Sequence, residues 1–383
     1  MKILHVADLH IGRYFNGISL LEDQQDMLSK LLSVVKEEKP QVVIIAGDLY
    51  DRSIPREDAV KVTDDFLTKL SKLCTKNLII TGNHDSHERV GFLSGLLEAQ
   101  GILVENEVRR PLRCITLEDE HGPVEFYLFP YRDTAILKSI YDLTSFRDDS
   151  MVYERIFKES RKRTKHRKVL VYHGFVAGSA KEDVEESESE RILSVGGHDY
   201  IKTSVFSDFH YVALGHLHKP QWVEKDRIRY AGSPMKYSFS EENHKKSISI
   251  VELGADGEVE VREIPLRAEK DVVTLTGHFH DLMNGSYEGN PNDYIRVMLE
   301  DQEEILDPMK RLKDRFPNIL ELRKKREETE IFQEQADFKM LEKNDVTELF
   351  QDFYRMKNDR ELSKEKIEAL RALLQEMKGG KEQ

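Results

Sequence analysis

Cysteine is scarce in this chain, and long apolar runs are absent. Only Cys74 and Cys114 occur among 383 residues, too few for a disulfide framework, so we expect two reduced thiols in a cytosolic protein. No apolar run approaches the roughly 20 residues that a membrane-spanning helix needs. A predicted strand also occupies the N-terminal place where a signal peptide would carry its apolar region. These absences predict a cytoplasmic protein without a membrane anchor.

Positive charge is in deficit. The sequence has 58 Lys and Arg against 71 Asp and Glu, a formal net charge of −13. Neutralisation of phosphates by Lys and Arg supplies most of the sequence-independent affinity for DNA. The composition therefore argues against a protein that binds duplex DNA tightly by itself.

Two charged runs stand out against this background. The basic run at residues 161–168 is the best candidate for a local DNA contact, although a solvated helix end explains it as well. The acidic run at residues 181–190 predicts a mobile, solvated loop without ligands. The candidate DNA contacts are Arg52, Arg161, Arg163 and Lys165.

Five short apolar runs rich in β-branched residues predict buried strands, and each run ends in a polar motif. The runs are residues 3–7, 42–46, 78–81, 169–172 and 211–214. The motifs are D-L-H at 8–10, G-D at 47–48, G-N-H-D at 82–85, Y-H-G at 172–174 and G-H-L-H at 215–218. Because ligands in open α/β sheets gather beyond the carboxyl ends of the strands, the five motifs can converge on one point.

The motifs supply seven possible metal ligands, all of them oxygen or nitrogen donors. They are Asp8, His10, Asp48, Asn83, His173, His216 and His218. Seven ligands are too many for one tetrahedral zinc, and no thiolate is among them. The set suits two divalent ions such as Mn²⁺ or Fe²⁺, with Asp48 as the bridge. Two ions roughly 3.5–4 Å apart can clamp an in-line phosphoryl displacement and activate a bridging water, which predicts a hydrolytic phosphoesterase.

The order of the motifs resembles that of the calcineurin-like metallophosphoesterases, which carry D-x-H, G-D, G-N-H-[DE], a lone His and G-H-x-H. A single short motif matches by chance, but the ordered set of five is specific. The run G-H-F-H at 277–280 copies the last motif, yet no acidic partner loops follow it. We interpret it as strand and turn residues.

Within that superfamily the chain resembles the SbcD-type nuclease subunits of bacterial double-strand-break processing complexes. The resemblance rests on residues 1–12, 47–51, 230–234 and 237–240 and covers roughly residues 1–240 well. It implies a Mn²⁺-dependent exonuclease and endonuclease that cleaves DNA ends and hairpins in repair, recombination and replication. It also implies an SbcC-type ATPase partner, a homodimer within a heterotetramer, and a cytoplasmic location on the bacterial nucleoid.

The resemblance implies a catalytic role for His84, close to the scissile phosphate but not on a metal. The archaeal and eukaryotic relatives carry a His where this chain has Asp51. The spacing Gly47-Asp48-x-x-Asp51-Arg52 is instead similar to the protein phosphatases of the superfamily, whose corresponding Asp orients the His of G-N-H. We therefore expect an Asp51–His84 dyad whose imidazole stabilises the transition state or protonates the leaving oxygen.

Hydrophobic periodicity predicts the organisation of the first two thirds of the chain. Residues 20–38 and 55–74 carry apolar side chains at helical spacing between three of the predicted strands. This order makes the first sheet largely parallel. Later runs at 124–129 and 248–253 look like antiparallel strands. We predict an α/β fold over residues 1–268, a two-sheet metallophosphoesterase β-sandwich flanked by helices.

A smaller module is predicted next. Residues 269–325 hold three predicted strands and a short helix, which indicates an α+β cap domain small enough to depend on docking. The predicted segments are 271–276, 294–299 and 319–323 for the strands and 305–315 for the helix. In SbcD-type proteins such a module caps the active site.

The C-terminal part combines a charged linker, residues 326–343, with two amphipathic helices within residues 344–378. Two short helices cannot bury both apolar stripes on each other alone, so the stripes favour helix-in-groove binding of a partner. The alternative is that both helices pack on the preceding module. SbcD-type proteins grip the coiled-coil base of their ATPase in this way, which assigns partner binding to Val346, Leu349, Phe350, Phe353, Ile367, Leu370, Leu374 and Met377.

Two other functions stay open at this point. The same centre could serve a small-molecule phosphodiesterase or phosphatase, because the metals contact only a phosphate ester. The fold could also be a scaffold that has lost catalysis. The added module and C-terminal helices favour a macromolecular substrate, and the complete ligand set with His84 favours an enzyme.

Overall fold

The computed structural model describes residues 1–178, 184–190, 200–325 and 366–367. The chain divides into two compact units, Met1–Arg323 and Lys324–Gln383, and four residues of the second unit are described. The predicted linker and most of the predicted partner-binding residues lie outside the described residues. These are Val346, Leu349, Phe350, Phe353, Leu370, Leu374 and Met377.

The first sheet has six strands in the order β16-β15-β1-β4-β5-β6. The last four of these run parallel, as their alternation with helices predicts, and β15 and β16 are antiparallel. The strand bounds are β1 (Lys2–Val6), β4 (Val42–Ala46), β5 (Asn77–Ile80), β6 (Ile102–Glu105), β15 (Ser247–Leu253) and β16 (Val259–Pro265).

The second sheet also has six strands, in the order β13-β14-β12-β9-β8-β7. The strand predicted at residues 124–129 is β8. It pairs with β7 in the predicted antiparallel sense, but it runs parallel to β9. The bounds are β7 (Arg113–Asp119), β8 (Gly122–Phe129), β9 (Arg167–His173), β12 (Tyr211–Gly215), β13 (Gln221–Glu224) and β14 (Ile228–Tyr230).

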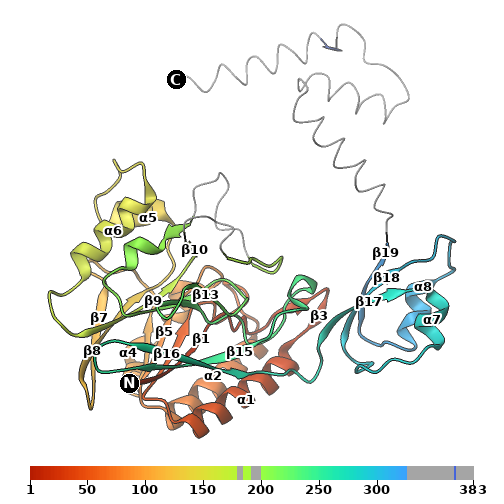
Figure 1. Ribbon diagram of the computed structural model, residues 1–383, viewed down its shortest axis with the longest axis horizontal. Coiled ribbons are helices and arrows are strands. Elements are labelled where there is room, and N and C mark those ends of the chain that lie inside the picture. Colours follow the sequence, from red (N-terminus) through yellow and green to blue (C-terminus); the bar gives the residue numbers. More distant parts are fainter. Residues whose placement is uncertain (179–183, 191–199, 326–365, 368–383) are drawn as a thin grey trace. The chain divides into compact units, whose positions relative to one another are not determined.

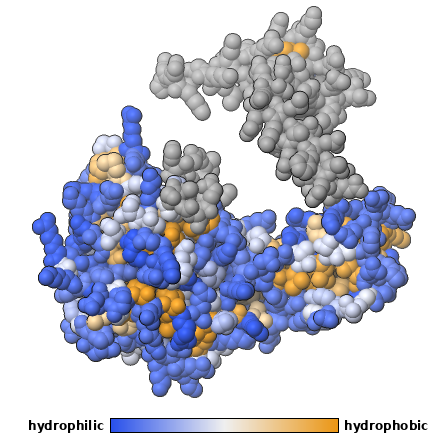
Figure 2. Space-filling model, viewed as in Figure 1, coloured by the Kyte–Doolittle hydropathy of each residue, from blue (hydrophilic) through white to orange (hydrophobic). Residues whose placement is uncertain are grey.

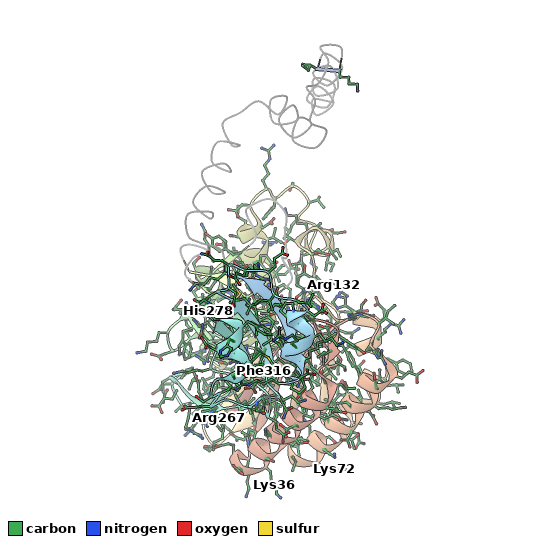
Figure 3. All side chains as sticks on the ribbon, turned by 90° about the vertical axis from the view of Figure 1, so that its right-hand side faces the viewer. Lys36, Lys72, Arg132, Arg267, His278 and Phe316 are labelled. Atoms are coloured by element: carbon green, nitrogen blue, oxygen red, sulfur yellow. The ribbon has the colours of Figure 1, made fainter. Side chains whose placement is uncertain are left out.

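The two sheets pack face to face, and helices cover their outer faces (Figure 1). Along β4 the side chains alternate, because successive residues of a strand point to opposite faces. Ile44 packs against the second sheet, whereas Val43 and Ile45 face α1 (Leu21–Glu38) and α2 (Glu57–Leu73). Lys36 and Lys72, in the last turns of these helices, lie at the same end of the helix layer (Figure 3).

The other helices and short strands surround this sandwich. α5 (Thr134–Ile140) and α6 (Asp149–Ser160) cover the outer face of the second sheet. The remaining short elements are β2 (Tyr14–Phe15), β3 (Ile18–Ser19), α3 (His87–Val90), α4 (Ser94–Glu98), β10 (Val176–Ala177), β11 (Ile201–Lys202), η2 (Thr203–Phe206) and η3 (Phe239–Glu241).

The predicted smaller module has its own three-stranded sheet, in the order β17-β18-β19, and its own apolar core. Its elements are β17 (Val272–Gly277), α7 (Phe279–Asn284), β18 (Tyr294–Leu299), α8 (Pro308–Lys313) and β19 (Ile319–Lys324). The three predicted strands are confirmed. The helix expected at 305–315 is shorter, and α7 was not predicted.

The G-H-F-H run at 277–280 does not enter a metal cluster of the described residues. His278 follows β17 and is 59% exposed, and His280 is 84% exposed. His280 lies in α7, so the expected strand and turn assignment is corrected there to a helix.

The module docks on the sandwich through Tyr294. Its hydroxyl donates to Asp23 of α1 at 2.5 Å, and the Lys270 ammonium lies 3.0 Å from the same carboxylate. The structure groups the module with the sandwich in one compact unit, so a separate domain beginning at residue 269 stays a prediction. The face drawn in Figure 2 is mostly hydrophilic, and none of the described helices is long and apolar enough to cross a membrane.

Asp119 ties the two sheets together and gives a test of the fold. Its buried carboxylate accepts hydrogen bonds from Arg167 at 2.5 and 3.0 Å and lies 2.8 Å from the Met1 ammonium. The hydrogen bonds from Arg167 hold the pKa of Asp119 below its usual range. Its stabilisation is therefore present at neutral pH and is lost as the pH falls below about 4.

We expect Asp119→Asn to lower the free energy of unfolding by about 3 kcal/mol at pH 7, because it leaves a buried Arg without its anion. The difference from the unsubstituted protein should shrink at pH 3. Urea denaturation at both pH values measures this, with Asp256→Asn in an exposed turn as the control. An equal loss at both pH values contradicts the argument.

Candidate metal centre

The five predicted motifs meet at one edge of the sandwich. β1, β4 and β5 are neighbours in the first sheet, and β9 and β12 are neighbours in the second. Each motif lies at the C-terminal end of its strand, so the parallel order brings them to the same edge. Main-chain hydrogen bonds join Asp8 N to Gly47 O at 3.1 Å and Gly174 N to Gly215 O at 3.3 Å.

One group of side chains gathers around His10. Its Nε2 atom lies 3.1 Å from Nε2 of His218 and 3.7 Å from Oδ2 of Asp48. The candidate ligand atoms of Asp8, His10 and His218 lie within 4.8 Å of one another, and all three residues are buried. These four side chains can hold one ion.

A second group gathers around His173. Its Nε2 atom lies 3.4 Å from the same Oδ2 of Asp48 and 2.8 Å from Oδ1 of Asn83. The His216 ring is adjacent, at 5.6 Å between ring centroids, and His216 N donates to the Asp8 carboxylate at 3.1 Å. The structure therefore brings the seven sequence-predicted ligands together, with Asp48 facing both groups.

The contact between His173 and Asn83 has no proton to share. His173 Nδ1 donates to Ala46 O at 2.9 Å, which leaves Nε2 as an acceptor that faces the Asn83 carbonyl oxygen, a second acceptor. The buried amide nitrogen of Asn83 has no hydrogen-bond partner in the described part of the chain. A cation between the two acceptors accounts for the contact, so the residues fit a metal.

The electrostatics of the cluster also favour a cation. Burial raises the pKa of Asp48 to about 6, and burial together with the Asp48 charge raises that of Asp8. Burial lowers the pKa of His173 and His218 to about 4. The imidazoles are therefore neutral at pH 7 and cannot balance the carboxylates. Oxygen and nitrogen donors without thiolate suit divalent ions.

The backbone at the motifs adopts a conformation that non-glycine residues rarely take. Asp8, His10 and Asp48 have φ of 55°, 44° and 51°, in the left-handed region, at a cost of about 1–3 kcal/mol each. Gly215 is required for a different reason: a Cβ there would lie 1.9 Å from Ala46 O. The glycine of G-H-x-H therefore allows the strand ends to approach closely.

Glu241 supports the candidate ligand His218, and the sequence analysis missed it. Its Oε1 lies 3.2 Å from Nδ1 of His218, and its Oε2 lies 2.5 Å from the ammonium of Lys246, which donates to His218 O at 2.8 Å. Although burial alone would raise it, the charge of Lys246 and the hydrogen bond from His218 hold the pKa of Glu241 below its usual range. The carboxylate therefore fixes the proton on Nδ1 and leaves Nε2 free for a metal.

The end of the acidic run also reaches the site, which corrects the prediction of a solvated loop without ligands. Ser189 Oγ lies 2.7 Å from His218 Nδ1, and a Glu190 carboxylate oxygen accepts from His218 N at 2.5 Å. Burial raises the pKa of Glu190 to about 7. The main-chain N–H groups of Ser187 and His218 donate hydrogen bonds to the Glu190 carboxylate. An acidic composition does not reveal that a carboxylate has such main-chain donors.

Asp85, the last residue of the G-N-H-D motif, joins two loops of the site. Its carboxylate accepts from the N–H groups of Leu49 at 3.1 Å, Tyr50 at 2.9 Å and Gly82 at 2.9 Å. Burial, with the Asp48 charge, raises its pKa to about 6. This residue holds the second and third motifs in register.

The structure gives His84 a different partner from the predicted one. His84 N donates to Asp48 at 2.8 Å, and His84 Nδ1 donates to the main-chain oxygen of Asp51 at 2.9 Å. The Asp51 carboxylate instead binds Arg13 at 2.7 Å, a residue that the sequence analysis missed, and lies 3.4 Å from Arg52. The carboxylate–imidazole dyad is corrected to a carbonyl–imidazole contact.

Three of the four predicted DNA contacts lie away from this centre. Arg161, Arg163 and Lys165 are exposed and precede β9, whereas His173 ends it. Six residue steps of strand separate the two ends by about 20 Å, so the basic run does not reach the metal centre. Arg52, 68% exposed beside Asp51, does lie next to it.

Two family models match the chain. Residues 1–220 match the calcineurin-like phosphoesterases. Residues 268–358 match the SbcD_C model, described as the type 5 capsule protein repressor C-terminal domain.

The solved structures that match this chain are distant in sequence. A dimetal phosphatase from Danio rerio is 14% identical, with 70% of this chain and 97% of that chain covered and a TM-score of 0.45. An anchor protein of the Plasmodium inner membrane complex is 12% identical (71% and 90%, TM-score 0.41). A protein from Thermus thermophilus is 11% identical (68% and 98%, TM-score 0.40).

Substitution of Glu241 tests the support of His218. We expect Glu241→Gln to weaken the binding of divalent metal by about 10–100-fold, because the neutral amide no longer stabilises the Nδ1 proton. Chelator competition with Mn²⁺ measures the affinity, and Glu260→Gln on exposed β16 is the control.

The substitution also leaves the buried Lys246 without its anion, which can lower stability by itself. The double variant Glu241→Gln/Lys246→Met removes that charge and should keep the weak metal binding. Recovery of normal metal affinity in the double variant contradicts a specific role for Glu241.

Proposed function

The chain belongs to the calcineurin-like phosphoesterase family, and from this premise we propose that it is a DNA nuclease of the SbcD type. It would hydrolyse phosphodiesters at DNA ends and hairpins, with two Mn²⁺ or Fe²⁺ ions and an SbcC-type ATPase as partner. The observation that carries the proposal is the Asp48 carboxylate shared by two groups of metal-ligating side chains. The SbcD_C match at residues 268–358 supports the nuclease type.

Each side of the centre has its own residues in this proposal. Asp8, His10 and His218 would hold one ion, and Asn83, His173 and His216 would hold the other, with Asp48 available to both. Two bound divalent ions supply Lewis-acid stabilisation of the phosphoryl transition state and an activated water. Because four imidazoles are poor ligands for Mg²⁺, Mn²⁺ should support activity better.

His84 is the proposed catalytic residue. The Asp51 carbonyl fixes the proton of Nδ1, so Nε2 is the ring nitrogen that can face a substrate. A protonated Nε2 would stabilise the transition-state charge or give its proton to the leaving 3′ oxygen. Asp51 acts as a positioning residue here, through its main chain and through its ion pair with Arg13. Arg52 is the remaining candidate for a contact with DNA.

The partners remain part of the proposal. The C-terminal helices would bind the SbcC-type ATPase, which would also supply DNA affinity that a chain of net charge −13 lacks. Exposed apolar side chains near α3 and α4 support a homodimer, since Phe92, Leu93 and Leu96 are 70%, 52% and 69% exposed. The location on the bacterial nucleoid follows from the same function.

His84→Ala tests the catalytic assignment. Cleavage of a duplex with an exposed end should fall by about 10²–10⁴-fold while the bound metal stays unchanged. Asp51→Asn should have a smaller effect, because its carbonyl remains, and exposed His121→Ala should have none. Metal analysis and initial rates with Mn²⁺ measure both. Faster turnover of bis-p-nitrophenyl phosphate than of DNA favours a small-molecule enzyme, and no turnover of either favours a scaffold.

Truncation after Lys343 tests the partner assignment. Metal binding and basal cleavage of single-stranded DNA should stay near normal, because the centre lies within the first compact unit. Co-purification with the ATPase and ATP-dependent end processing should be lost. Tight association after the truncation would refute the assignment.

A further inference from the structure

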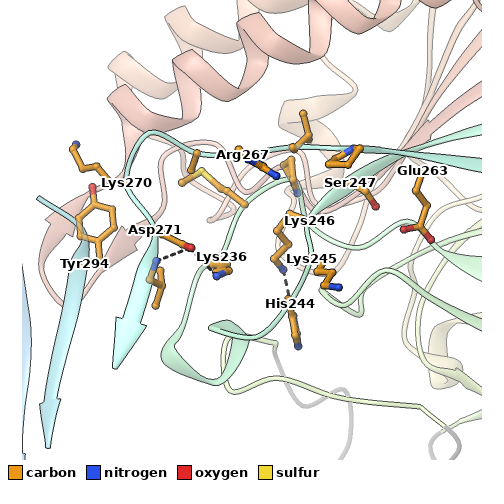
Figure 4. Close-up of a pocket in the computed structure, with 16 residues that line it drawn as sticks. Lys236, His244, Lys245, Lys246, Ser247, Glu263, Arg267, Lys270, Asp271 and Tyr294 are labelled. Carbon is orange, nitrogen blue, oxygen red and sulfur yellow. Dashed lines mark hydrogen bonds and ion pairs between the residues drawn. The ribbon is translucent and has the colours of Figure 1, made fainter. Parts of the chain in front are cut away.

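A second cavity, apart from the metal centre, lies where the smaller module meets the sandwich. Its volume is about 670 Å³, within the usual range for small-molecule sites. Its lining side chains come from the segment before β15, from β16 and the residues after it, and from the first two strands of the module (Figure 4).

Cations outnumber anions in the lining, and most of them have partners. Lys236 lies 2.7 Å from Asp271, Lys246 lies 2.5 Å from Glu241, and Lys270 lies 3.0 Å from Asp23. The lining residue Glu263 is paired with Arg229. These pairs balance the charge on each side of the cavity.

Two lining cations remain unbalanced. The side chains of Lys245 and Arg267 form no hydrogen bond or ion pair within the described ranges 1–178, 184–190 and 200–325. Both of these side chains are exposed, whereas the Ser247 hydroxyl is itself inaccessible and does not face the cavity. The cavity thus offers two unpaired positive charges.

The rest of the lining is apolar except for His244 and Tyr294, whose polar atoms bond to Glu185 and Asp23. Met235 and Leu266 are buried, and Pro234, Val272 and Ala268 extend this wall. Such a surface does not interact favourably with a small inorganic anion, but it can pack against a flat ring. A methionine sulfur also favours contact with aromatic rings. The lining therefore fits an anion that carries an apolar or aromatic body.

We propose that this cavity is a second ligand site that binds a nucleoside monophosphate, with the phosphate at Lys245 and Arg267 and the base on the Met235–Leu266 wall. A phosphate monoester carries about −1.5 to −2 charges at pH 7, which matches two unpaired cations, whereas each phosphodiester of a DNA backbone carries one. The choice of a nucleotide rests on the proposed function, because a nuclease releases such molecules.

The ligand would contact residues of both the sandwich and the module. Lys246 lines the cavity and also donates to the main-chain oxygen of the metal ligand His218 at 2.8 Å. A ligand in the cavity would therefore touch a residue that supports the metal centre. A site of this kind can sense the product of cleavage or the phosphorylated end of a strand.

Calorimetry of the full-length protein with deoxyadenosine monophosphate tests the proposal. EDTA is present, so that no metal at the centre can hold the phosphate. We expect one site per chain, with affinity about tenfold weaker in each of Lys245→Ala and Arg267→Ala, since a charge-assisted hydrogen bond is lost. Lys225→Ala, which removes an exposed cation from the β13–β14 turn, is the matched control.

Further titrations identify the ligand class. Deoxyadenosine and inorganic phosphate should each bind at least about tenfold more weakly, because each lacks one half of the recognised chemistry. A 5′-phosphorylated oligonucleotide that binds more tightly, and is weakened by the same substitutions, identifies a strand end as the source. No binding of the monophosphate, or binding that neither substitution changes, overturns the proposal. Nuclease assays with Mn²⁺ are run separately, so failure to cleave DNA rejects the proposed function without rejecting the site.

Discussion

The rest of the site depends on the position of the Asp48 carboxylate, which lies between two groups of neutral imidazoles. Its Oδ2 lies 3.7 Å from His10 and 3.4 Å from His173, and these two residues come from different sheets. Burial raises its pKa and lowers those of the surrounding histidines, so the neutral imidazoles do not offset the negative charge of an ionised Asp48. Divalent ions would supply the missing positive charge.

The fold accepts local strain to build this arrangement. Four candidate ligands, Asp8, His10, Asp48 and His216, have positive φ, and glycines let the strand ends approach closely. The extended hydrophobic packing of the two sheets offsets these costs, because the strands that carry the motifs are almost fully buried. Stability is therefore concentrated in the strands, and strain is concentrated in the loops that follow them.

The surroundings of His218 connect the centre to the smaller module. Glu241 and Lys246 hold His218 from behind, and Lys246 also lines the cavity that the module completes. One buried ion pair thus has the candidate ligand His218 on one side and the cavity on the other. This connection gives the module a physical route to the candidate metal centre through Lys246.

Local patterns in the chain were enough to predict the five strands that end in the motifs, the two long helices and the seven candidate ligands. β-branched runs predict buried strands, apolar spacing predicts α1 and α2, and a parallel order brings the strand ends together. Three features emerged only from the folded chain: Glu241 and Glu190 support His218, the Asp51 carboxylate turns to Arg13, and the basic run lies at the far end of β9. These contacts of Glu241, Glu190 and Asp51 join residues that lie up to 38 positions apart, as between Arg13 and Asp51. A pattern within one segment cannot encode such a pairing, because packing of the whole chain selects which of several charged side chains is buried beside which partner.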